Sequence, residues 1–340
     1  MAERRLVIDE PGSLALREVA AKAPGPGEAL VRPAHVGVCG TDLELLDGVV
    51  DPAYVRYPLV PGHEWSGVVA AVGPGVTNVA PGQRVIAEGI VPCRACDMCA
   101  RGLTNLCATY DELGFTRSGA AATQVVLPAF LLHPLAAHVS MVEAALAEPL
   151  AVAWRGIGRG SPRPGERIAV VGDGTIALIA AHLLRLFSPA ELVVFGQRAE
   201  QADLAVALGA TGFETGPRDE RFDLVVEAAG AASAVERALG LARRGGRVVL
   251  LGLAGNDVRA AFPVDDVVNN DLLIAASFGY TSAAFGEVAD LLSAGQIKLG
   301  PLVTHRFPLE KFADAYQVLR SGTGGPPGPR GPRGKVMLDI

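Results

Sequence analysis

The sequence predicts a two-domain α/β protein that combines a doubly wound parallel-sheet domain with a β-rich domain. The chain has 340 residues, which at roughly 150 residues per domain corresponds to about two domains. Half of its residues are apolar and 19% are charged, as in folded globular proteins. From about residue 165 onward, strand-like and helix-like segments alternate, which predicts a parallel sheet covered on both faces.

The first 150 residues contain short β-favouring runs separated by turn residues. Examples are residues 29–33, 67–73 and 84–87, each bounded by Gly, Pro or Asn. Such runs are typical of antiparallel sheets or barrels. The segment 156–166 is rich in Gly and Pro and poor in apolar residues, and we expect it to connect the two domains.

The second part begins with a predicted buried strand at 167–171, a helix at 175–187 and a strand at 191–195. The remaining elements are expected as a helix at 199–208, a strand at 222–227, a helix at 233–243, a strand at 246–251 and a further strand at 272–277. After about residue 285 the chain is expected to leave this domain. A collagen-like run at 325–334 has too few triplets for a triple helix and predicts a loop before a last strand at 335–340.

The charge pattern excludes several classes of partner. The net charge is −6 and no basic block occurs, which argues against binding to nucleic acid or to an anionic membrane. A charge-free run at 118–142 contains two prolines and two histidines, so we do not interpret it as a membrane span. No signal peptide is visible at the N-terminus, and we expect a cytoplasmic protein.

Four cysteines occur close together in the sequence as Cys-x-x-Cys-x-x-Cys-x7-Cys: Cys93, Cys96, Cys99 and Cys107. In a reducing compartment this spacing predicts a metal site, and four thiolates form a closed, structural Zn²⁺ site. An iron–sulfur cluster or unused thiols are the alternatives; the cluster motif has a shorter last spacer followed by Pro, and here Ala108 follows. The lobe at 92–108 has little apolar content, so the ion is expected to hold its shape.

A dinucleotide-binding fingerprint lies between the predicted strand 167–171 and the helix that follows it. Gly172-Asp173-Gly174-Thr175-Ile176-Ala177 has the form Gly-x-Gly-x-x-Ala, in which the glycines allow a tight turn and close approach of a pyrophosphate. An ordinary tight strand–helix turn is the alternative. The position of the motif at the start of an alternating strand–helix series favours the cofactor interpretation.

The end of the second predicted strand bears on which nucleotide binds. A cofactor with a free ribose is typically held by Asp or Glu at this place, whereas the sequence here reads Phe195-Gly196-Gln197-Arg198. Gly196 leaves room for a phosphate and Arg198 is suited to bind one, so the sequence favours NADP over NAD. The alternative is that Arg198 only begins the next helix and faces solvent.

The fifth cysteine, Cys39, combines with a later His-Glu pair to give the ligand set of a catalytic zinc ion. Cys39 lies in Gly-Val-Cys-Gly-Thr-Asp, and His63 and Glu64 lie in Pro-Gly-His-Glu. A site with thiolate, imidazole and carboxylate ligands keeps one position open for water or substrate. Taken singly, these residues have ordinary structural interpretations as a buried Cys, a capping His and a surface Glu.

Over essentially its whole length the chain resembles the zinc-dependent medium-chain alcohol and polyol dehydrogenases. The resemblance rests on residues 37–42, residues 62–64, the four-cysteine lobe, Glu-Pro-Leu-Ala at 148–151 and the Gly-rich loop, in the order found in that family. It implies a GroES-like catalytic domain packed on a Rossmann domain. The implied boundaries are 1–150 for the catalytic domain, 151–284 for the Rossmann domain and 285–340 for a return to the catalytic domain.

The resemblance also implies roles for individual residues. Cys39, His63 and Glu64 correspond to zinc ligands, and Glu148 to the carboxylate that binds zinc directly or through water in the sorbitol and glucose dehydrogenase branch. Thr41 matches the hydroxyl that passes on the substrate proton, and Asp42 the partner that orients a ligand. One catalytic and one structural zinc ion per chain, and a homodimer or homotetramer, are expected.

One position departs from the family pattern. Many relatives have His two residues after Asp42, where this chain has Glu44, so either Glu44 takes over the end of the proton path or it is a solvated helix residue. The other histidines match no ligand position and are expected to be structural: His35, His133, His138, His182 and His305.

The expected reaction is hydride transfer between NAD(P) and a secondary alcohol of a sugar, polyol or (amino)cyclitol. Short stretches at 60–67 and 112–116 are similar to the 2-deoxy-scyllo-inosamine dehydrogenases of aminocyclitol pathways. A threonine-dehydrogenase-like enzyme and a non-catalytic zinc protein of the same fold are the alternatives. A zinc-lobe nucleic-acid binder is disfavoured, because Arg94 and Arg101 are balanced by nearby acidic residues.

Overall fold

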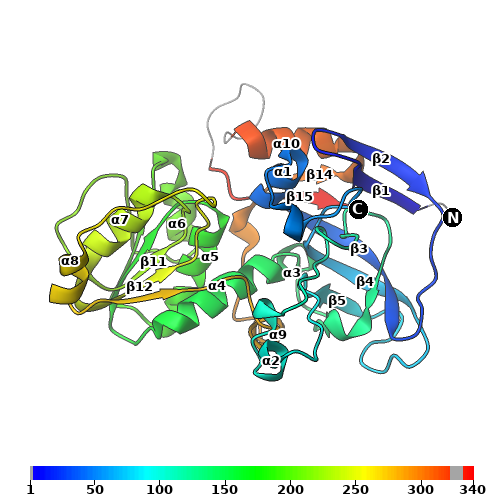
Figure 1. Cartoon of the computed structure of the whole chain (residues 1–340), viewed down its shortest axis with the longest axis horizontal. Helices are drawn as coiled ribbons and strands as arrows, with labels where there is room; N and C mark the ends of the chain where they lie inside the picture. The colour runs from blue at the N-terminus through cyan, green and yellow to red at the C-terminus, as the bar shows by residue number, and fades with distance from the viewer. Residues whose placement is uncertain (1–2, 322–331) are drawn as a thin grey trace. The chain divides into compact units, whose positions relative to one another are not determined.

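The computed structural model describes residues 3–321 and 332–340, and it divides into two compact units (Figure 1). Among the described residues, unit 1 contains 3–148, 281–321 and 335–340, and unit 2 contains 149–280 and 332–334. The chain enters unit 2 within helix α4 (Ala147–Gly160) and returns to unit 1 just before helix α9 (Ser282–Ser293). The boundaries implied by the family resemblance, at 150 and 284, lie within four residues of these points.

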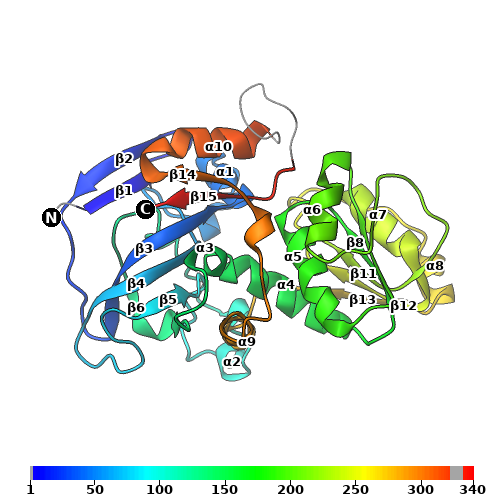
Figure 2. The same cartoon turned by 180° about the vertical axis from the view of Figure 1, so that it is seen from behind.

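Unit 1 is built on a mixed sheet in the strand order β14-β15-β3-β4-β5-β7, with β6 paired to β3 (Figure 2). A separate hairpin, β1-β2, precedes it. The strands are β1 (Glu3–Ile8), β2 (Leu14–Val19), β3 (Glu28–Val38), β4 (Glu64–Val72), β5 (Arg84–Ala87), β6 (Val125–Pro128), β7 (Leu132–Pro134), β14 (Val303–Pro308) and β15 (Lys335–Asp339). The β-rich domain predicted for the first 150 residues is therefore present, and the last strand of the chain completes it.

The central strand β3 sets the geometry of unit 1. It pairs antiparallel with β4 on one side and with β15 on the other, so that Gly37 faces Glu64 in one pair and Met337 in the other. Trp65, Val36 and Val336 belong to the buried core formed against these strands. The helices of unit 1 are α1 (Gly40–Asp47), α2 (Asp97–Ala100), α3 (Met141–Ala144), α9 and α10 (Phe312–Ser321).

Unit 2 contains a fully parallel six-stranded sheet in the order β10-β9-β8-β11-β12-β13. The strands are β8 (Arg167–Val171), β9 (Glu191–Phe195), β10 (Gly212–Glu214), β11 (Phe222–Glu227), β12 (Ala242–Leu250) and β13 (Leu273–Ala276). The direction of strand succession reverses between β8 and β11, which is where open α/β sheets bind ligands. The bounds predicted for β8, β9 and β11 agree with the structure because each is an apolar run ended by Gly or a charged residue.

The helices of unit 2 are α4, α5 (Thr175–Leu184), α6 (Ala202–Ala207), α7 (Ala232–Leu241) and α8 (Val264–Asn269). Helix α5 links β8 to β9 in one direction across the sheet, and α7 links β11 to β12 in the opposite direction. Because parallel crossovers are right-handed, α5 and α7 lie on opposite faces, which is the doubly wound arrangement. The strands β8, β9 and β11 are buried accordingly.

The prediction that 156–166 connects the two domains is wrong, because this segment lies within unit 2 and its first five residues belong to helix α4. Helix α4 continues through Gly156 and Gly160, and the irregular segment begins only after it. A Cβ at Gly156 would clash with Leu251, and one at Gly160 with Leu224 and Val249. The two glycines, spaced four residues apart, therefore let one face of α4 pack directly against the sheet, and this packing outweighs their low helix propensity.

Most of the collagen-like run at 325–334 lies outside the described residues, so the predicted loop is not tested. In the part of the chain that the structure describes, no helix is both long and apolar enough to cross a membrane.

Candidate active site and nucleotide loop

Cys39 lies at the junction between strand β3 and helix α1. It is the N-cap residue of α1, and its backbone N–H donates to Asp42 Oδ2 at 2.8 Å. Asp42 is buried, with 1% of its surface exposed. Thr41 follows in the first helical turn, with its Oγ1 3.7 Å from Cys39 Sγ. Helix capping thus fixes the thiol and the hydroxyl side by side.

His63 and Glu64 lie where the chain enters strand β4. The turn before them uses Gly62 at φ +99°, and a Cβ at this position would meet the backbone nitrogen of Ala121 at 2.9 Å. Only glycine suits this combination of backbone conformation and close packing. The exposed fractions of His63 and Glu64 are 5% and 1%, and the His63 ring packs against Phe115 with centroids 5.2 Å apart.

The structure brings Cys39, His63 and Glu64 together, as the sequence predicted. One potential ligand atom from each of the three lies within 4.8 Å of the others. Among the described residues, His63 Nδ1 and Asp42 Oδ1 are buried without a hydrogen-bond partner, whereas the Glu64 carboxylate is paired with a cationic side chain. Burying polar atoms without partners costs free energy, and a bound cation would pair with nitrogen and oxygen atoms of this type. The group therefore fits a zinc ion with an open fourth position.

Lys335 is a member of this cluster that the sequence analysis did not find. Its Nζ lies 2.5 Å from the Glu64 carboxylate, and both side chains are almost fully buried. Burial favours the neutral amine, but the charges of Glu64 and Cys39 hold the pKa of Lys335 above its usual value. A Cβ at Gly37, on the strand between them, would clash with both side chains, so this glycine makes room for the pair.

Two further carboxyl groups lie in the same electrostatic environment. Burial raises the pKa of Glu148, near the start of α4, to about 8, and the charges of Glu64 and Glu112 add to this rise while His63 opposes it. Burial likewise raises the pKa of Glu112 to about 7. Glu148 does not belong to the close ligand group of Cys39, His63 and Glu64. Glu112 is a second residue at this site that sequence reasoning did not identify as functional.

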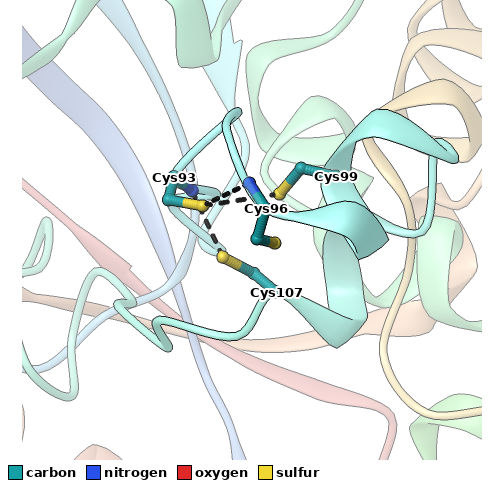
Figure 3. A group of neighbouring side chains, drawn as sticks. All are labelled: Cys93, Cys96, Cys99 and Cys107. Carbon is teal, nitrogen blue, oxygen red and sulfur yellow. Dashed lines mark hydrogen bonds between the residues drawn. The ribbon is translucent and has the colours of Figure 1, made fainter.

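The four cysteines of the lobe converge as the spacing predicts (Figure 3). Their sulfur atoms lie within 4.8 Å of one another, and the Cys93 and Cys99 sulfurs are 3.9 Å apart. Four sulfurs at about 2.3 Å from one ion would be separated by about 3.8 Å. Backbone N–H groups lower the pKa of Cys93 and lower that of Cys96 to about 6, which favours thiolates at these two positions, whereas burial raises the pKa of Cys99 to about 12. All five cysteines are free of disulfides. Among the described residues, His63 is the one histidine in the two candidate metal groups.

The Gly-rich loop lies at the carboxyl end of β8, beside the end of β11. Gly172 has φ +127°, and a Cβ there would meet the backbone of Ala228 at 3.1 Å. Gly174 is the N-cap of α5, and Thr175 and Ile176 begin the helix, so its first backbone N–H groups face outward from the loop. This is the arrangement that binds a pyrophosphate.

Gln197 and Arg198 follow the end of β9, as predicted, but Arg198 does not simply face solvent. Its guanidinium group binds Asp173, the residue between the two glycines of the fingerprint, with Nη2 2.7 Å from Oδ1. In the Gly-x-Gly-x-x-Ala pattern Asp173 is only the variable second position, and the motif gives no sign of this contact.

Comparison with known proteins agrees with this geometry. Residues 25–137 match the alcohol dehydrogenase GroES-like domain family, and residues 129–321 match the glucose dehydrogenase C-terminus family. The chain belongs to the zinc-dependent medium-chain alcohol and polyol dehydrogenases. The predicted fold class, a Rossmann domain with a GroES-like domain, and the predicted oxidoreductase class are confirmed.

Individual members of the family are similar over nearly the whole chain. Sorbitol dehydrogenase of Gallus gallus is 31% identical over 94% of each chain, and probable D-xylulose reductase A of Aspergillus clavatus is 30% identical over 88% of each. The crystal structure of a putative zinc-binding dehydrogenase from Sinorhizobium meliloti, bound to NADP, has a TM-score of 0.90 at 27% identity and covers all of both chains.

Proposed function

We propose that this dehydrogenase transfers a hydride between NAD(P) and a secondary alcohol of a sugar, polyol or (amino)cyclitol. The observation that carries the proposal is the convergence of Cys39, His63 and Glu64 in a chain that also has a dinucleotide fingerprint at the switch point of a parallel sheet. The relatives named for sorbitol and xylulose support the substrate class.

In this proposal Cys39, His63 and Glu64 hold the catalytic zinc ion, and Glu148 contributes its carboxylate directly or through water. When bound there, zinc is a Lewis acid that lowers the pKa of a substrate hydroxyl. Asp42 Oδ1 lies 3.9 Å from His63 Nδ1, and we assign Asp42 the role of orienting the imidazole. The four lobe cysteines hold a second, structural zinc ion.

Thr41 is assigned the transfer of the substrate proton. Its hydroxyl lies beside the Cys39 thiol, is held on the first turn of α1, and can both donate and accept a hydrogen bond. Glu44 lies one turn further along α1 and remains the candidate for the end of the proton path.

The polarity of the site supports a polyhydroxylated or amino-substituted substrate over a simple alcohol. The charges of Glu64 and Glu112 contribute to the raised pKa of Glu148, so the three carboxyl groups lie near one another. Carboxyl groups can pair with several hydroxyl or ammonium groups of one substrate, whereas an aliphatic alcohol offers a single hydroxyl.

The nucleotide is assigned to the loop and strand end of unit 2. Gly172 and Gly174 allow the pyrophosphate to approach, the backbone of Thr175 and Ile176 supplies N–H donors, and Gln197 and Arg198 lie where the adenosine ribose is expected. The bound nicotinamide supplies the hydride acceptor.

We also propose a cytoplasmic homodimer or homotetramer. Strand β13 is an edge strand of the unit 2 sheet, and its Leu273 and Ile274 are 57% and 37% exposed. An apolar edge of this type is typically covered by another chain. Light scattering of the purified protein should give a mass of two or four chains, and Ile274→Lys should reduce it; a monomeric wild type would contradict this proposal.

The reaction is tested by incubating the purified protein with NADP⁺ or NAD⁺ and a substrate panel. The panel should include sorbitol, xylitol, 2-deoxy-scyllo-inosamine, threonine and ethanol, with reduced nicotinamide followed by absorbance. We expect turnover of at least one polyol or cyclitol and none by Cys39→Ser. Turnover of threonine or ethanol alone would contradict the substrate class, and no turnover with fully occupied zinc sites would contradict catalysis.

A further inference from the structure

Asp173, the middle residue of the Gly-x-Gly loop, contacts Gln197 and Arg198 through its side chain and accepts a further bond from Arg198 Nη2 at its backbone carbonyl. Its side chain reaches from the end of β8 to the turn after β9. Oδ2 accepts the backbone N–H groups of Gln197 and Arg198, both at 2.9 Å. Oδ1 accepts Nε and Nη2 of Arg198 at 3.1 and 2.7 Å.

These contacts use the whole acceptor capacity of the carboxylate. An ionised carboxylate has about four lone-pair sites, and Asp173 fills four with donors from one short turn. It therefore has none left for the two hydroxyls of a ribose, which is what an acidic residue binds at this place in NAD-specific sites. Asp173 is not a substitute for the acidic residue that β9 lacks.

Gly196 permits this arrangement. A Cβ at this position would lie 2.8 Å from the Asp173 carboxylate and would also clash with Phe213. A side chain at position 196 would therefore push Asp173 away from the turn. Gly196, the Asp173 carboxylate and the Arg198 guanidinium group are therefore packed directly against one another.

Gln201 and the backbone of Arg333 form a second set of hydrogen bonds that holds the loop containing Asp173 in place. Gln201 is fully buried, and its Nε2 donates to the backbone carbonyls of Asp173 at 2.8 Å and Arg333 at 2.9 Å. The Arg333 N–H donates to Gln201 Oε1 at 2.8 Å. Burial, with the positive charge of Arg198 next, lowers the pKa of Arg333, so the two guanidinium groups lie near each other. Arg198 and Arg333 carry two positive charges and Asp173 one negative charge, so these three groups together have a net charge of about +1.

We propose that Asp173 is a positioning residue that holds the guanidinium group of Arg198 to receive the 2′-phosphate of NADP. Nε and Nη2 of Arg198 both donate to Asp173, and no hydrogen bond among the described residues uses its Nη1. A pre-ordered planar guanidinium loses less side-chain entropy when it binds a phosphate. The inference rests on the proposed function only in requiring that a nucleotide binds at the Gly172–Gly174 loop.

Two physical effects predict opposite results when the carboxylate is removed. If Asp173 acted only through its charge, its loss would strengthen phosphate binding, because a negative charge would disappear near the site. If Asp173 positions Arg198, its loss weakens phosphate binding, because the guanidinium group becomes mobile. The amide oxygen of Asp173→Asn can still accept both backbone N–H groups, but its NH₂ group faces the guanidinium. The variant therefore removes both side-chain bonds to Arg198 with little change in volume and leaves only the bond from Nη2 to the backbone carbonyl of residue 173.

The experiment measures binding of 2′,5′-ADP and 5′-AMP to the full-length, zinc-containing protein by isothermal titration calorimetry. The ratio of the two Kd values measures how much the 2′-phosphate contributes to binding. The affinity for 5′-AMP shows whether the Gly172–Gly174 loop is intact. We expect the wild type to bind 2′,5′-ADP at least about tenfold tighter, Arg198→Gln to lose this preference, and Asp173→Asn to reduce it severalfold with 5′-AMP affinity unchanged. Glu200→Gln, which removes an exposed charge two residues after Arg198, is the matched control and should keep the wild-type preference.

Three results would overturn the inference: a wild type with no preference, a preference that rises in Asp173→Asn, or an equal loss of both ligands in that variant. Each of these leaves the proposed reaction intact, because alcohol oxidation with NAD would still be possible. Absence of binding by either nucleotide, in contrast, would remove the cofactor site and the proposed function with it.

Discussion

The Lys335 ammonium group lies 2.5 Å from the Glu64 carboxylate in the buried centre of unit 1. The two residues are 271 positions apart and come from strands on either side of β3. Glu64 therefore has a cationic partner even when no metal is bound. This explains how a carboxylate with 1% exposure is tolerated in a core of apolar side chains.

Replacing Lys335 should affect the metal-free protein more than the metal-bound protein. Lys335→Met removes the only cation paired with Glu64 among the described residues, and an unpaired buried charge costs about 3–5 kcal/mol in the free energy of unfolding. Zinc bound to Glu64 would compensate much of this loss. Urea unfolding before and after removal of the chelatable zinc measures both values.

The exposed Lys311→Met is a matched control and should change the free energy of unfolding by less than about 0.5 kcal/mol. If Lys335→Met lost the same stability with and without zinc, Glu64 would not be a metal ligand.

The two predicted zinc ions should be separable by mutation. Cys107→Ser should lower the zinc content from two ions per chain to one and make the 92–108 lobe sensitive to protease, because this segment has little apolar content to hold it. Cys39→Ser should also leave one ion but an intact lobe. Zinc analysis combined with limited proteolysis distinguishes the two variants. A wild-type protein that contains iron or no metal would refute the assignment of two zinc ions.

Thr41 should affect the rate more than the assembly of the site. Thr41→Val keeps the shape of the side chain but removes the hydroxyl beside Cys39, so kcat for alcohol oxidation should fall about 10²-fold or more, with zinc content unchanged. Thr41→Ser restores a hydroxyl and should recover most of the activity. Equal rates for the Val variant and the wild type would exclude Thr41 from the proton path.

Stability should decrease with acid in a way that depends on His182. Burial, and then the charge of Arg185, lowers the pKa of this histidine to about 4, while the Leu208 carbonyl opposes the shift. The unfolded chain takes up a proton at this position below about pH 6.5, whereas the folded chain does so only near pH 4. Stability is therefore complete above pH 6.5 and is lost as the pH falls toward 4, by at most about 3 kcal/mol.

Urea unfolding at several pH values should show a shallower acid dependence for His182→Asn than for the wild type. The same substitution at the exposed His138 is the control and should keep the wild-type slope. An unchanged slope in His182→Asn would show that the buried ring is not responsible.

Local sequence patterns predicted much of the fold and the residues that come together in the two candidate metal groups. Strands β8, β9 and β11 are short and mainly apolar, with charged residues only near their ends, and such runs identify buried parallel strands without knowledge of their partners. The cysteines of the lobe lie so close together in sequence that their spacing alone indicates a shared ion. Helix α4 was not predicted, because glycine at 156 and 160 disfavours a helix until the sheet against which it packs is known.

The sequence by itself determined the chemistry available to this protein: the ligand types, the fingerprint loop and the alternation of strands and helices. Only the tertiary structure showed that Lys335 neutralises Glu64 and that Asp173 binds Arg198. Both pairs are electrostatic contacts between residues far apart in the chain. Their energy depends on distance and burial, which strand register and packing decide and which no local pattern of residues encodes.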